Sequence, residues 1–461
     1  MVDRIADFTQ ELPSRRVSPI GQSAEAGRIA DEFLAAPPEQ GAALSMLMER
    51  VDRAADLAVE SGSAGMLAAI PGGGLYSSAL AEFYSRALNR FGGFASSAPG
   101  LTAMEDGVLR WIAQDVCGMP VGSAGVLTTG GSSANLSAVL AARRSRLGEN
   151  IERGCVYVTA QAHHSVAKAA RIAGIRNANI RVVPHTGDLR MDVPAAEAAV
   201  QQDRRAGLHP FLLVGTAGTT NTGAIDPLRQ VGELARREGL WFHVDAAYGG
   251  FFRLTRRGRG LMSGIESADS ITLDPHKSLF LPFGTGALVV RDPARLAAAY
   301  ADPDDLGVDG RPYLQDVRPY WRLPDYSGLS PELSREVRGL RLWLPLHLHG
   351  VAAFREALDE KLDLAARLHE RLCDLPGLEV SAPPTLSIVT FRVRPADASE
   401  TAQAAADKAT RALLERINAD GRVLIHSTTI EGRQAIRICI LTHRTHADLV
   451  ERAVEIITAA L

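Results

Sequence analysis

The sequence predicts an α/β fold: a mostly parallel central sheet flanked by helices, with an N-terminal helical segment and a small C-terminal α+β domain. Two patterns support this fold class. Between residues 96 and 345, short apolar runs rich in β-branched residues alternate with stretches of helical periodicity. Before this region the periodicity is helical, and after it helical stretches mix with a few strand-like runs. We therefore expect three parts, residues 1–95, 96–345 and 346–461.

The first part is predicted to be helical. Apolar residues recur at helical spacing in Ala43–Ala58 and again in Ser77–Leu88. One proline and three glycines, from Pro71 to Gly74, lie between these stretches and predict a turn.

The second part contains six runs that we expect to be strands. Most are continuous apolar runs rather than alternations, which is typical of strands covered by helices on both faces of a sheet. The runs are Cys155–Thr159, Ile180–Val183, Phe211–Gly215, Leu240–Asp245, Ser270–Leu273 and Gly286–Arg291. The segment Ala301–Ser330, rich in proline and aspartate, is predicted to be a long loop, and such loops in compact enzymes are often functional.

The third part is predicted to be a small α+β domain. A helical stretch from Glu332 to Leu375 leads into it. Strand-like runs at Leu386–Val393 and Ala435–Leu441 then alternate with helical stretches at Glu400–Ala419 and Ala447–Leu461.

Composition excludes several classes of partner. The formal net charge of −3 argues against binding to nucleic acid or to an anionic membrane. The four cysteines lie far apart and form no CxxC pair, which indicates a reducing, cytoplasmic setting rather than a disulfide framework. The first sixteen residues contain acids and no apolar core, so we expect no signal peptide, and no apolar stretch is long enough to span a membrane.

A lysine follows one of the predicted strands. Lys277 lies in the sequence Asp-Pro-His-Lys-Ser directly after Ser270–Leu273. A lysine removed from water has a lowered pKa and can act as a nucleophile towards an aldehyde. Taken alone, Lys277 is better explained as a lysine at a strand end whose amine reaches solvent.

An aspartate ends another strand. Asp245 closes the run Leu240–Asp245, and the carboxyl ends of parallel strands border the crevice where ligands bind in such sheets. Pyridoxal 5′-phosphate (PLP) requires an acidic partner for its pyridine nitrogen, and the small Ala246 and Ala247 would let a flat ring lie close. The alternative for Asp245 alone is a helix N-cap.

The segment Thr128 to Leu136 reads TTGGSSANL and precedes an amphipathic helix predicted at Leu136–Arg146. Glycines and serines at a helix N-terminus offer N–H and hydroxyl groups to an anion, which suits a monophosphate. The segment matches neither the dinucleotide fingerprint nor the Walker loop. A capped helix without a ligand is the alternative.

His163 follows the run Cys155–Thr159 and can stack on a planar ring. Metal binding is the competing idea, but no HxxxH or Cys/His spacing occurs nearby, so we expect no metal.

Together these motifs resemble the group II PLP-dependent decarboxylases, the family of the aromatic-amino-acid, histidine, glutamate and diaminobutyrate decarboxylases. The matching motifs are TTGGSSANL (128–136), AHHSVAKAA (162–170), GTAGTTNTGAID (215–226), HVDAAYGG (243–250) and DPHK (274–277). The resemblance implies the fold type I architecture of PLP enzymes. It also implies roles for eight residues: Lys277 for the Schiff base with PLP, Asp245 for the pyridine nitrogen, His163 for ring stacking, Gly131, Ser132 and His276 for the phosphate, and Thr220 and Ala247 for the ring.

The same resemblance implies a catalytic tyrosine on a mobile loop that reaches the neighbouring subunit's site. Tyr313 is the best match, with Tyr320 and Tyr326 as rivals. Members with phenylalanine at this position tend to be oxidative aldehyde synthases, so a tyrosine favours decarboxylation. The implied assembly is a homodimer with shared active sites, in which residues 1–95 wrap the partner.

In the aromatic branch of the family that the motifs resemble, the segment before the large domain supplies aromatic side chains to the pocket. At the matching positions this chain has the smaller and less aromatic residues Ala69, Ile70, Pro71, Gly72 and Gly93, which fit either a bulky substrate side chain or a different substrate class. No arginine or aspartate marks the pocket for a charged side chain, so we expect an aromatic or largely apolar L-amino acid. The alternatives are a PLP-dependent aminotransferase, an oxidative aldehyde synthase, or a non-catalytic regulator with the same fold.

Overall fold

The computed structural model describes residues 2–17, 24–70, 72–301 and 322–461. The chain forms two compact units. The larger comprises Gly74–Ala365 with Pro383–Ile388, and the smaller comprises Met1–Gly73, Ala366–Ala382 and Val389–Leu461. The three predicted parts, divided at residues 95 and 345, do not coincide with these two units. The predicted domain boundaries stay a prediction.

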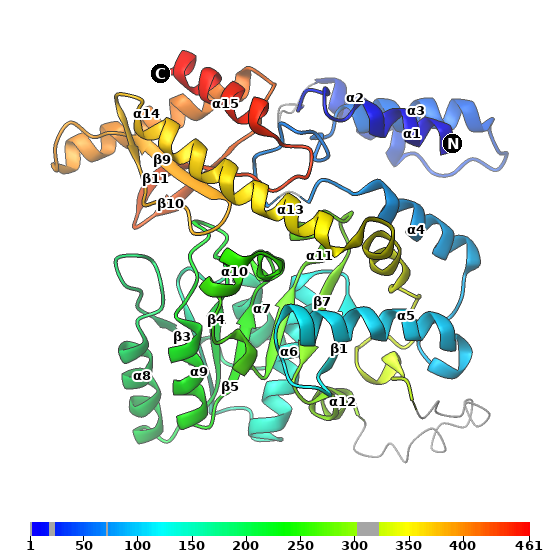
Figure 1. Cartoon of the computed structure of the whole chain (residues 1–461), viewed down its shortest axis with the longest axis vertical. Helices are drawn as coiled ribbons and strands as arrows, with labels where there is room; N and C mark the ends of the chain where they lie inside the picture. The colour runs from blue at the N-terminus through cyan, green and yellow to red at the C-terminus, as the bar shows by residue number, and fades with distance from the viewer. Residues whose placement is uncertain (1, 18–23, 71, 302–321) are drawn as a thin grey trace. The chain divides into compact units, whose positions relative to one another are not determined.

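The strands of the larger unit are β1 (Ala124–Thr128), β2 (Gly154–Thr159), β3 (Ile180–Val183), β4 (His209–Thr216), β5 (Trp241–Asp245), β6 (Ser270–Leu273) and β7 (Gly286–Val290). They form a seven-stranded sheet of order β1-β7-β6-β5-β4-β2-β3. Figure 1 labels β1, β3, β4, β5 and β7 of this sheet. Strands β2 to β6 pair in parallel, whereas β7 is antiparallel to both β1 and β6. The sheet is therefore mostly parallel, as predicted.

Helices surround this sheet. They are α4 (Tyr76–Leu88), α5 (Pro99–Arg110), α6 (Gly131–Leu147), α7 (His164–Ile172), α8 (Val193–Arg205), α9 (Leu228–Arg237), α10 (Arg256–Leu261), α11 (Pro275–Ser278), α12 (Pro293–Tyr300) and α13 (Leu340–Cys373), whose last turns belong to the smaller unit. Helix α6 packs against strands β4 to β7, and α9 packs against β4 and β5. Strands β2, β5, β6 and β7 are wholly buried beneath these helices, which explains their continuous apolar runs, whereas the edge strand β3 is only partly covered.

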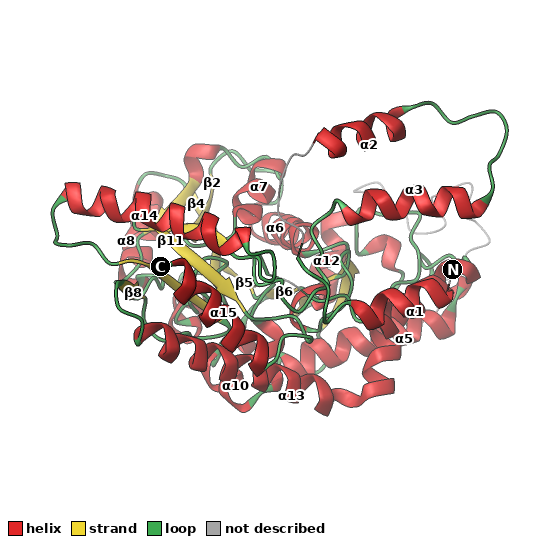
Figure 2. Cartoon of the chain, turned by 90° about the horizontal axis from the view of Figure 1, so that it is seen from above, coloured by secondary structure: helices red, strands yellow, loops and turns green. Residues whose placement is uncertain are grey.

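The smaller unit contains helices α1 (Val2–Glu11), α2 (Ala24–Leu34), α3 (Leu44–Asp56), α14 (Glu400–Ala419) and α15 (Ala447–Ala460). Its sheet has the order β10-β11-β9-β8, with β8 (Leu378–Val380), β9 (Ile388–Val393), β10 (His426–Ile430) and β11 (Arg433–Cys439). Figure 2 shows α2 and α3 as separate helices joined by a long loop. None of the helices in the described residues combines the length and apolar character needed to cross a bilayer.

The strands and helices that were predicted differ from the observed ones mainly at their ends, but β8 and β10 of the smaller unit were not predicted. Strand β1 was not predicted, because its five residues include a glycine and end in the polar turn that follows. Helix α6 begins at Gly131 instead of Leu136, since the glycine and serine residues form its first turn. Helix α13 begins at Leu340 instead of Glu332 and is interrupted at Gly350, where φ is 73°.

The residues just before α13 are held by ion pairs instead of helical hydrogen bonds. Arg335 pairs with Glu105, and both side chains are 1% exposed or less. Glu105 also accepts hydrogen bonds from the backbone N–H groups of Arg338 and Gly339, at 3.0 Å each. A single buried carboxylate therefore holds this segment against helix α5.

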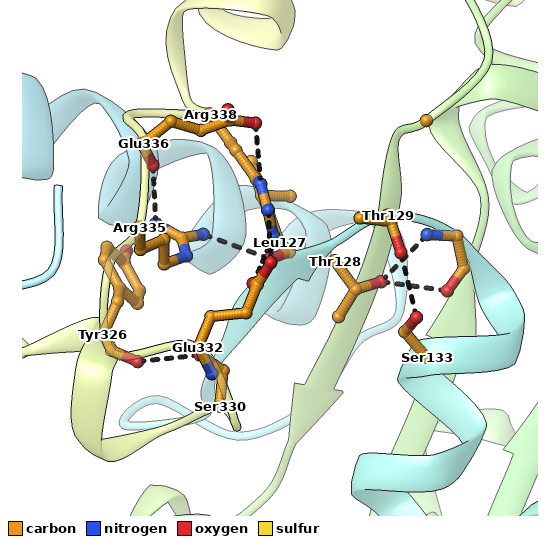
Figure 3. A network of polar contacts seen from close by, with 12 residues as sticks. Leu127, Thr128, Thr129, Ser133, Tyr326, Ser330, Glu332, Arg335, Glu336 and Arg338 are labelled. Atoms are coloured by element: carbon orange, nitrogen blue, oxygen red, sulfur yellow. Dashed lines mark hydrogen bonds and ion pairs between the residues drawn. The ribbon is translucent and has the colours of Figure 1, made fainter. Parts of the chain in front are cut away.

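The side chains of Arg335 and Arg338 bind the end of β1. Arg335 and Arg338 both donate to the carbonyl of Leu127, at 3.1 and 3.2 Å, as Figure 3 shows. Arg338 is itself held by both carboxylate oxygens of Glu332, at 2.7 Å each. These contacts fix the strand end from which the glycine-rich turn leaves the sheet.

Substituting Glu105 by glutamine should destabilise the fold by about 3–5 kcal/mol, because the change leaves the buried Arg335 cation without a counter-charge. Whichever way the amide turns, its NH₂ group would face another donor, either the Arg335 guanidinium or the backbone N–H groups of Arg338 and Gly339. Urea unfolding, followed by circular dichroism, measures the free energy. The matched control is Glu149→Gln, which removes an exposed partner of Arg144 and should change little. Equal effects of both substitutions would contradict the importance of the buried pair.

Candidate active site

A cavity of about 250 Å³ lies in the larger unit where strands β4, β5 and β6 end. Thr216, Asp245 and Thr272 are register partners on these three strands, so the strands end at the same level. The cavity is lined by Thr129, Gly130, Gly131, Ser132, Ser133, Asn135, His163, Ser165, Thr216, Gly218, Thr220, Asp245, Ala247, Tyr248, Asp274, His276 and Lys277. All of these residues belong to the five motifs singled out in the sequence, and each motif contributes at least two of them.

Lys277 lies on the short helix α11, which follows β6 directly. Its Nζ atom is 2.9 Å from Oδ2 of Asp274, one helical turn earlier, and the lysine side chain is 23% exposed. Asp274 is only 2% exposed, and its other oxygen, Oδ1, has no hydrogen-bond partner in the described residues. Asp274 was not among the predicted site residues, although its three-residue spacing from Lys277 places the two side chains on one side of a helical turn.

Asp245 ends β5 with a carboxylate that is 4% exposed. Its Oδ2 accepts from Nδ2 of Asn135 at 3.0 Å, and its Oδ1 accepts from the backbone N–H of Ala247 at 3.1 Å. Burying a charge is costly unless it is hydrogen-bonded, and these two donors offset that cost. Asn135 was part of a quoted motif, but its contact with Asp245 was not predicted.

His163 is the N-cap of helix α7, and its Nδ1 accepts from the backbone N–H of Ser165 at 3.3 Å. The Oγ of Ser165 is 2.7 Å from the same nitrogen. Burial lowers the pKa of His163, although Asp245 acts in the opposite direction. The side chain is therefore a neutral ring on the cavity wall, which suits stacking on a planar ligand.

The glycine-rich turn forms another wall of the cavity. Gly131 begins helix α6, and a Cβ atom there would lie 2.9 Å from Oδ2 of Asp274 and 3.2 Å from Cβ of Ala247. Thr129 and Ser133 join their hydroxyl groups at 2.9 Å, as Figure 3 shows. A helix N-terminus without side-chain bulk is a suitable seat for a phosphate.

His276 lies beside this turn. Its Nδ1–H donates to the carbonyl of Thr285 at 2.6 Å, which fixes the orientation of the ring. Burial lowers the pKa of His276, and the carboxylate of Asp274 opposes that shift.

The donor set of the cavity fits PLP. It holds one amine, a buried carboxylate, an imidazole ring and a turn rich in hydroxyl and N–H groups, which match the aldehyde, the pyridine nitrogen, the ring face and the phosphate. Oδ1 of Asp274 and Oγ1 of Thr216, on residues that line this cavity, are buried and have no hydrogen-bond partner among the described residues.

All eight cofactor-binding residues predicted from the sequence line this one cavity: Gly131, Ser132, His163, Thr220, Asp245, Ala247, His276 and Lys277. Their roles stay predictions. Tyr313 and Tyr320 lie outside the described residues. Tyr326 is described; it is 1% exposed, it packs under the guanidinium of Arg335 at 4.5 Å, and it does not line the cavity.

Comparison with known proteins identifies the family. Residues 30–394 match the model described as the pyridoxal-dependent decarboxylase conserved domain. The chain belongs to this family. The resemblance drawn from the motifs is thereby confirmed, together with PLP as the cofactor and with the enzyme class, the PLP-dependent carboxy-lyases.

Relatives of this decarboxylase-family protein cover most of its length. Aromatic-L-amino-acid decarboxylase from Bacillus atrophaeus is 30% identical over 454 residues, covering 97% of this chain and 91% of the relative. Phenylacetaldehyde synthase from Petunia hybrida is 31% identical over 390 residues, covering 80% and 76%. A crystal structure of Oryza sativa TDC with PLP and tryptamine superposes with a TM-score of 0.90 at 29% identity, covering 100% and 95% of the two chains. This match confirms the predicted fold type I architecture.

Proposed function

We propose that the protein decarboxylates an aromatic or largely apolar L-amino acid to the corresponding amine and CO₂, with PLP attached to Lys277. The observation that supports this most strongly is the cavity itself, which gathers an amine, a carboxylate, an imidazole ring and a phosphate-binding turn at one sheet edge. The relatives named as aromatic-amino-acid decarboxylases support the aromatic class.

Each wall of the cavity has a separate task in this proposal. Lys277 would hold the cofactor aldehyde, and Asp274, whose Oδ2 lies 2.9 Å from the lysine Nζ, would orient the amine. Asp245 would keep a proton on the pyridine nitrogen, and His163 would cover the ring face. Bound PLP supplies an electron sink for the electron pair that the departing carboxylate leaves behind.

The phosphate would be held by Gly131, Ser132 and His276 at the start of α6. Thr220 and Ala247 would confine the ring from the sides. Because these groups belong to packed elements, they would fix the cofactor in one orientation before the substrate arrives.

A proton must be returned to the substrate carbon after CO₂ leaves. We assign this step to Tyr313 of the neighbouring subunit, acting as a general acid through its phenolic O–H. Tyr326 is the weaker candidate because its ring is buried under Arg335.

The residues that line the cavity support a substrate with an uncharged side chain. Among the described residues that line it, Lys277 is the sole lysine or arginine, and Asp245 and Asp274 are the acids. Each of these three already has a task at the cofactor. A substrate with a charged side chain would therefore lack an obvious partner there, which favours an apolar or aromatic side chain.

An oxidative aldehyde synthase is the second candidate, because phenylacetaldehyde synthase is among the relatives. The tyrosine at position 313 favours amine formation. An aminotransferase would differ from both by requiring an oxo-acid co-substrate.

A homodimer with shared active sites is the proposed assembly. Helix α3 has no buried residue, and its apolar side chains Leu44, Met46, Leu47 and Val51 are 40–62% exposed. Residues of this kind are usually covered by a partner. A second copy of the chain would cover them and would bring Tyr313 into the neighbouring site.

An amine-product screen over the common L-amino acids, with added PLP, tests the reaction. Aromatic substrates should yield amine and CO₂ without oxygen uptake and without an added oxo acid.

Lys277→Ala should lose both the amine product and the visible absorption of bound PLP, whereas Lys168→Ala, on the exposed side of α7, should keep both. An intact absorption band in Lys277→Ala would exclude Lys277 as the attachment site.

Tyr313→Phe should retain PLP but form amine about 10²–10⁴-fold more slowly, because a general acid contributes a factor of this size. Chromatography of amine and aldehyde products measures the change. Tyr320→Phe is the matched control and should leave amine formation unaltered. Amine formation at the wild-type rate in Tyr313→Phe would remove the tyrosine from the mechanism.

Mixing the two inactive variants tests the shared site. In a dimer of one Lys277→Ala subunit and one Tyr313→Phe subunit, one site regains both groups if the tyrosine acts in trans. With random assortment of subunits, the mixture should recover about a quarter of wild-type activity. Sedimentation equilibrium should show a dimer throughout. A fully active monomer, or a dimeric mixture with no recovery, would contradict the proposal.

A further inference from the structure

One face of strand β5 is polar although it is wholly buried. Trp241, His243 and Asp245 alternate along the strand and therefore point to the same side, which helix α6 covers. A strand in the interior of a parallel sheet normally presents apolar residues to a covering helix. The departure from that pattern indicates that these polar groups have a task.

The polar groups form one continuous chain of hydrogen bonds. Nε1 of Trp241 donates to Oγ of Ser270 at 2.8 Å, and the same oxygen is 2.8 Å from Nδ1 of His243. Nε2 of His243 is 3.0 Å from Oδ1 of Asn135. The Nδ2 group of Asn135 then donates to Asp245 at 3.0 Å.

Asn135 is the branch point of this chain. Besides Asp245, its Nδ2 group also donates to Oγ of Ser165 at 2.9 Å. Ser165 lies 2.7 Å from Nδ1 of His163. The two side chains that are expected to touch the cofactor ring, Asp245 at its nitrogen and His163 at its face, are thus joined through one amide.

The hydrogen bonds can run in one direction only. The ionised Asp245 accepts and cannot donate, so the amide of Asn135 must turn its NH₂ group towards it and its oxygen towards His243. His243 must then donate from Nε2 and, being neutral, accept at Nδ1 from the hydroxyl of Ser270. Ser165, which accepts from Asn135, has its own hydroxyl proton free for Nδ1 of His163.

Burial makes this arrangement rigid. Asn135 is 1% exposed, and His243 and Ser270 are fully buried. Burial also lowers the pKa of His243 to about 4, so the ring is neutral at physiological pH, although Asp245 opposes the shift. Without water to replace a lost partner, no member of the chain can turn without leaving another unsatisfied.

We propose that Asn135 and His243 are positioning residues for PLP. Asn135 sets the carboxylate orientation of Asp245 and holds the Ser165 hydroxyl against Nδ1 of His163, whose Nε2–H tautomer the backbone N–H of Ser165 also favours, and His243 prevents the Asn135 amide from flipping. This inference rests on the proposed function for the roles of Asp245 and His163. The direction of the hydrogen bonds belongs to the protein itself.

The first test is made on the apoprotein, without cofactor or substrate. In ¹⁵N-histidine-labelled protein at pH 7, His243 and His163 should both show a protonated Nε2 and an unprotonated Nδ1. His243→Gln and His163→Gln assign the two signals. A doubly protonated His243, or a proton on its Nδ1, would overturn the proposed direction of the chain.

The second test measures PLP binding by equilibrium dialysis. Asn135→Ala and His243→Phe should weaken PLP binding by about 10–100-fold, the loss typical when a residue that orients a ligand-binding group is removed. His243→Gln keeps an N–H donor near the position of Nε2 and should restore most of the affinity. Tyr157→Phe removes another buried hydrogen bond of the same sheet, to Asp203 at 2.7 Å, and should bind PLP normally.

The outcomes separate this inference from the proposed function. Folded Asn135→Ala that binds PLP as tightly as wild type would refute the positioning role, whatever the substrate. If Asn135→Ala does not fold, the comparison of His243→Phe with His243→Gln decides instead. A wild-type protein with the expected histidine tautomers and PLP affinities, but without amine product, would refute the decarboxylation and leave the positioning role intact.

Discussion

The buried carboxylate of Asp245 is the constraint on which the arrangement of the cavity depends. A charge that is 4% exposed at the end of a strand is tolerated only if donors surround it. One donor comes from the turn that follows β5, and the other from Asn135 on helix α6. Helix α6 must therefore lie where Asn135 can reach Asp245, the carboxylate that the pyridine nitrogen of PLP would meet.

Helix α6 joins the two ends of the cofactor site. Gly131 begins the helix at the phosphate-binding turn, and Asn135 follows four residues later, a rise of about 6 Å along the helix. A single helical turn thus sets the distance between the phosphate seat and the donor to Asp245. The strand that leads into this turn is held from behind, because Arg335 and Arg338 both bind the carbonyl of Leu127.

Local pattern was sufficient for much of the fold of the larger unit. Strands β3 and β6 were predicted to the residue, and the other predicted strands of the larger unit to within two residues at either end. Lys277 and Asp245 were noticed because each follows or ends an apolar run, but their roles were assigned only through the combined motifs and the family resemblance. The Glu105–Arg335 pair was not found, because its members are 230 residues apart and neither has a local signal.

The links between the motifs were likewise beyond prediction from local sequence. Asn135 and Asp245 are 110 residues apart, and Asn135 and His243 are 108 apart. In the sequence, His243 reads as one polar residue inside an apolar run, and its role depends on Ser270 from the next strand. Such partners become visible only when the register of β5 and β6 is known.

The choice of asparagine at position 135 follows from the number and kind of its contacts. The site requires two donors, for Asp245 and Ser165, and one acceptor, for His243. A side-chain amide supplies this set, whereas a carboxylate supplies only acceptors and a hydroxyl only one donor. Aspartate would also place a second negative charge 3.0 Å from the first, where the two could not both ionise without a large cost. The hydrogen-bond geometry therefore requires a side-chain amide at position 135. Packing of α6 against the sheet would by itself accept any small residue there.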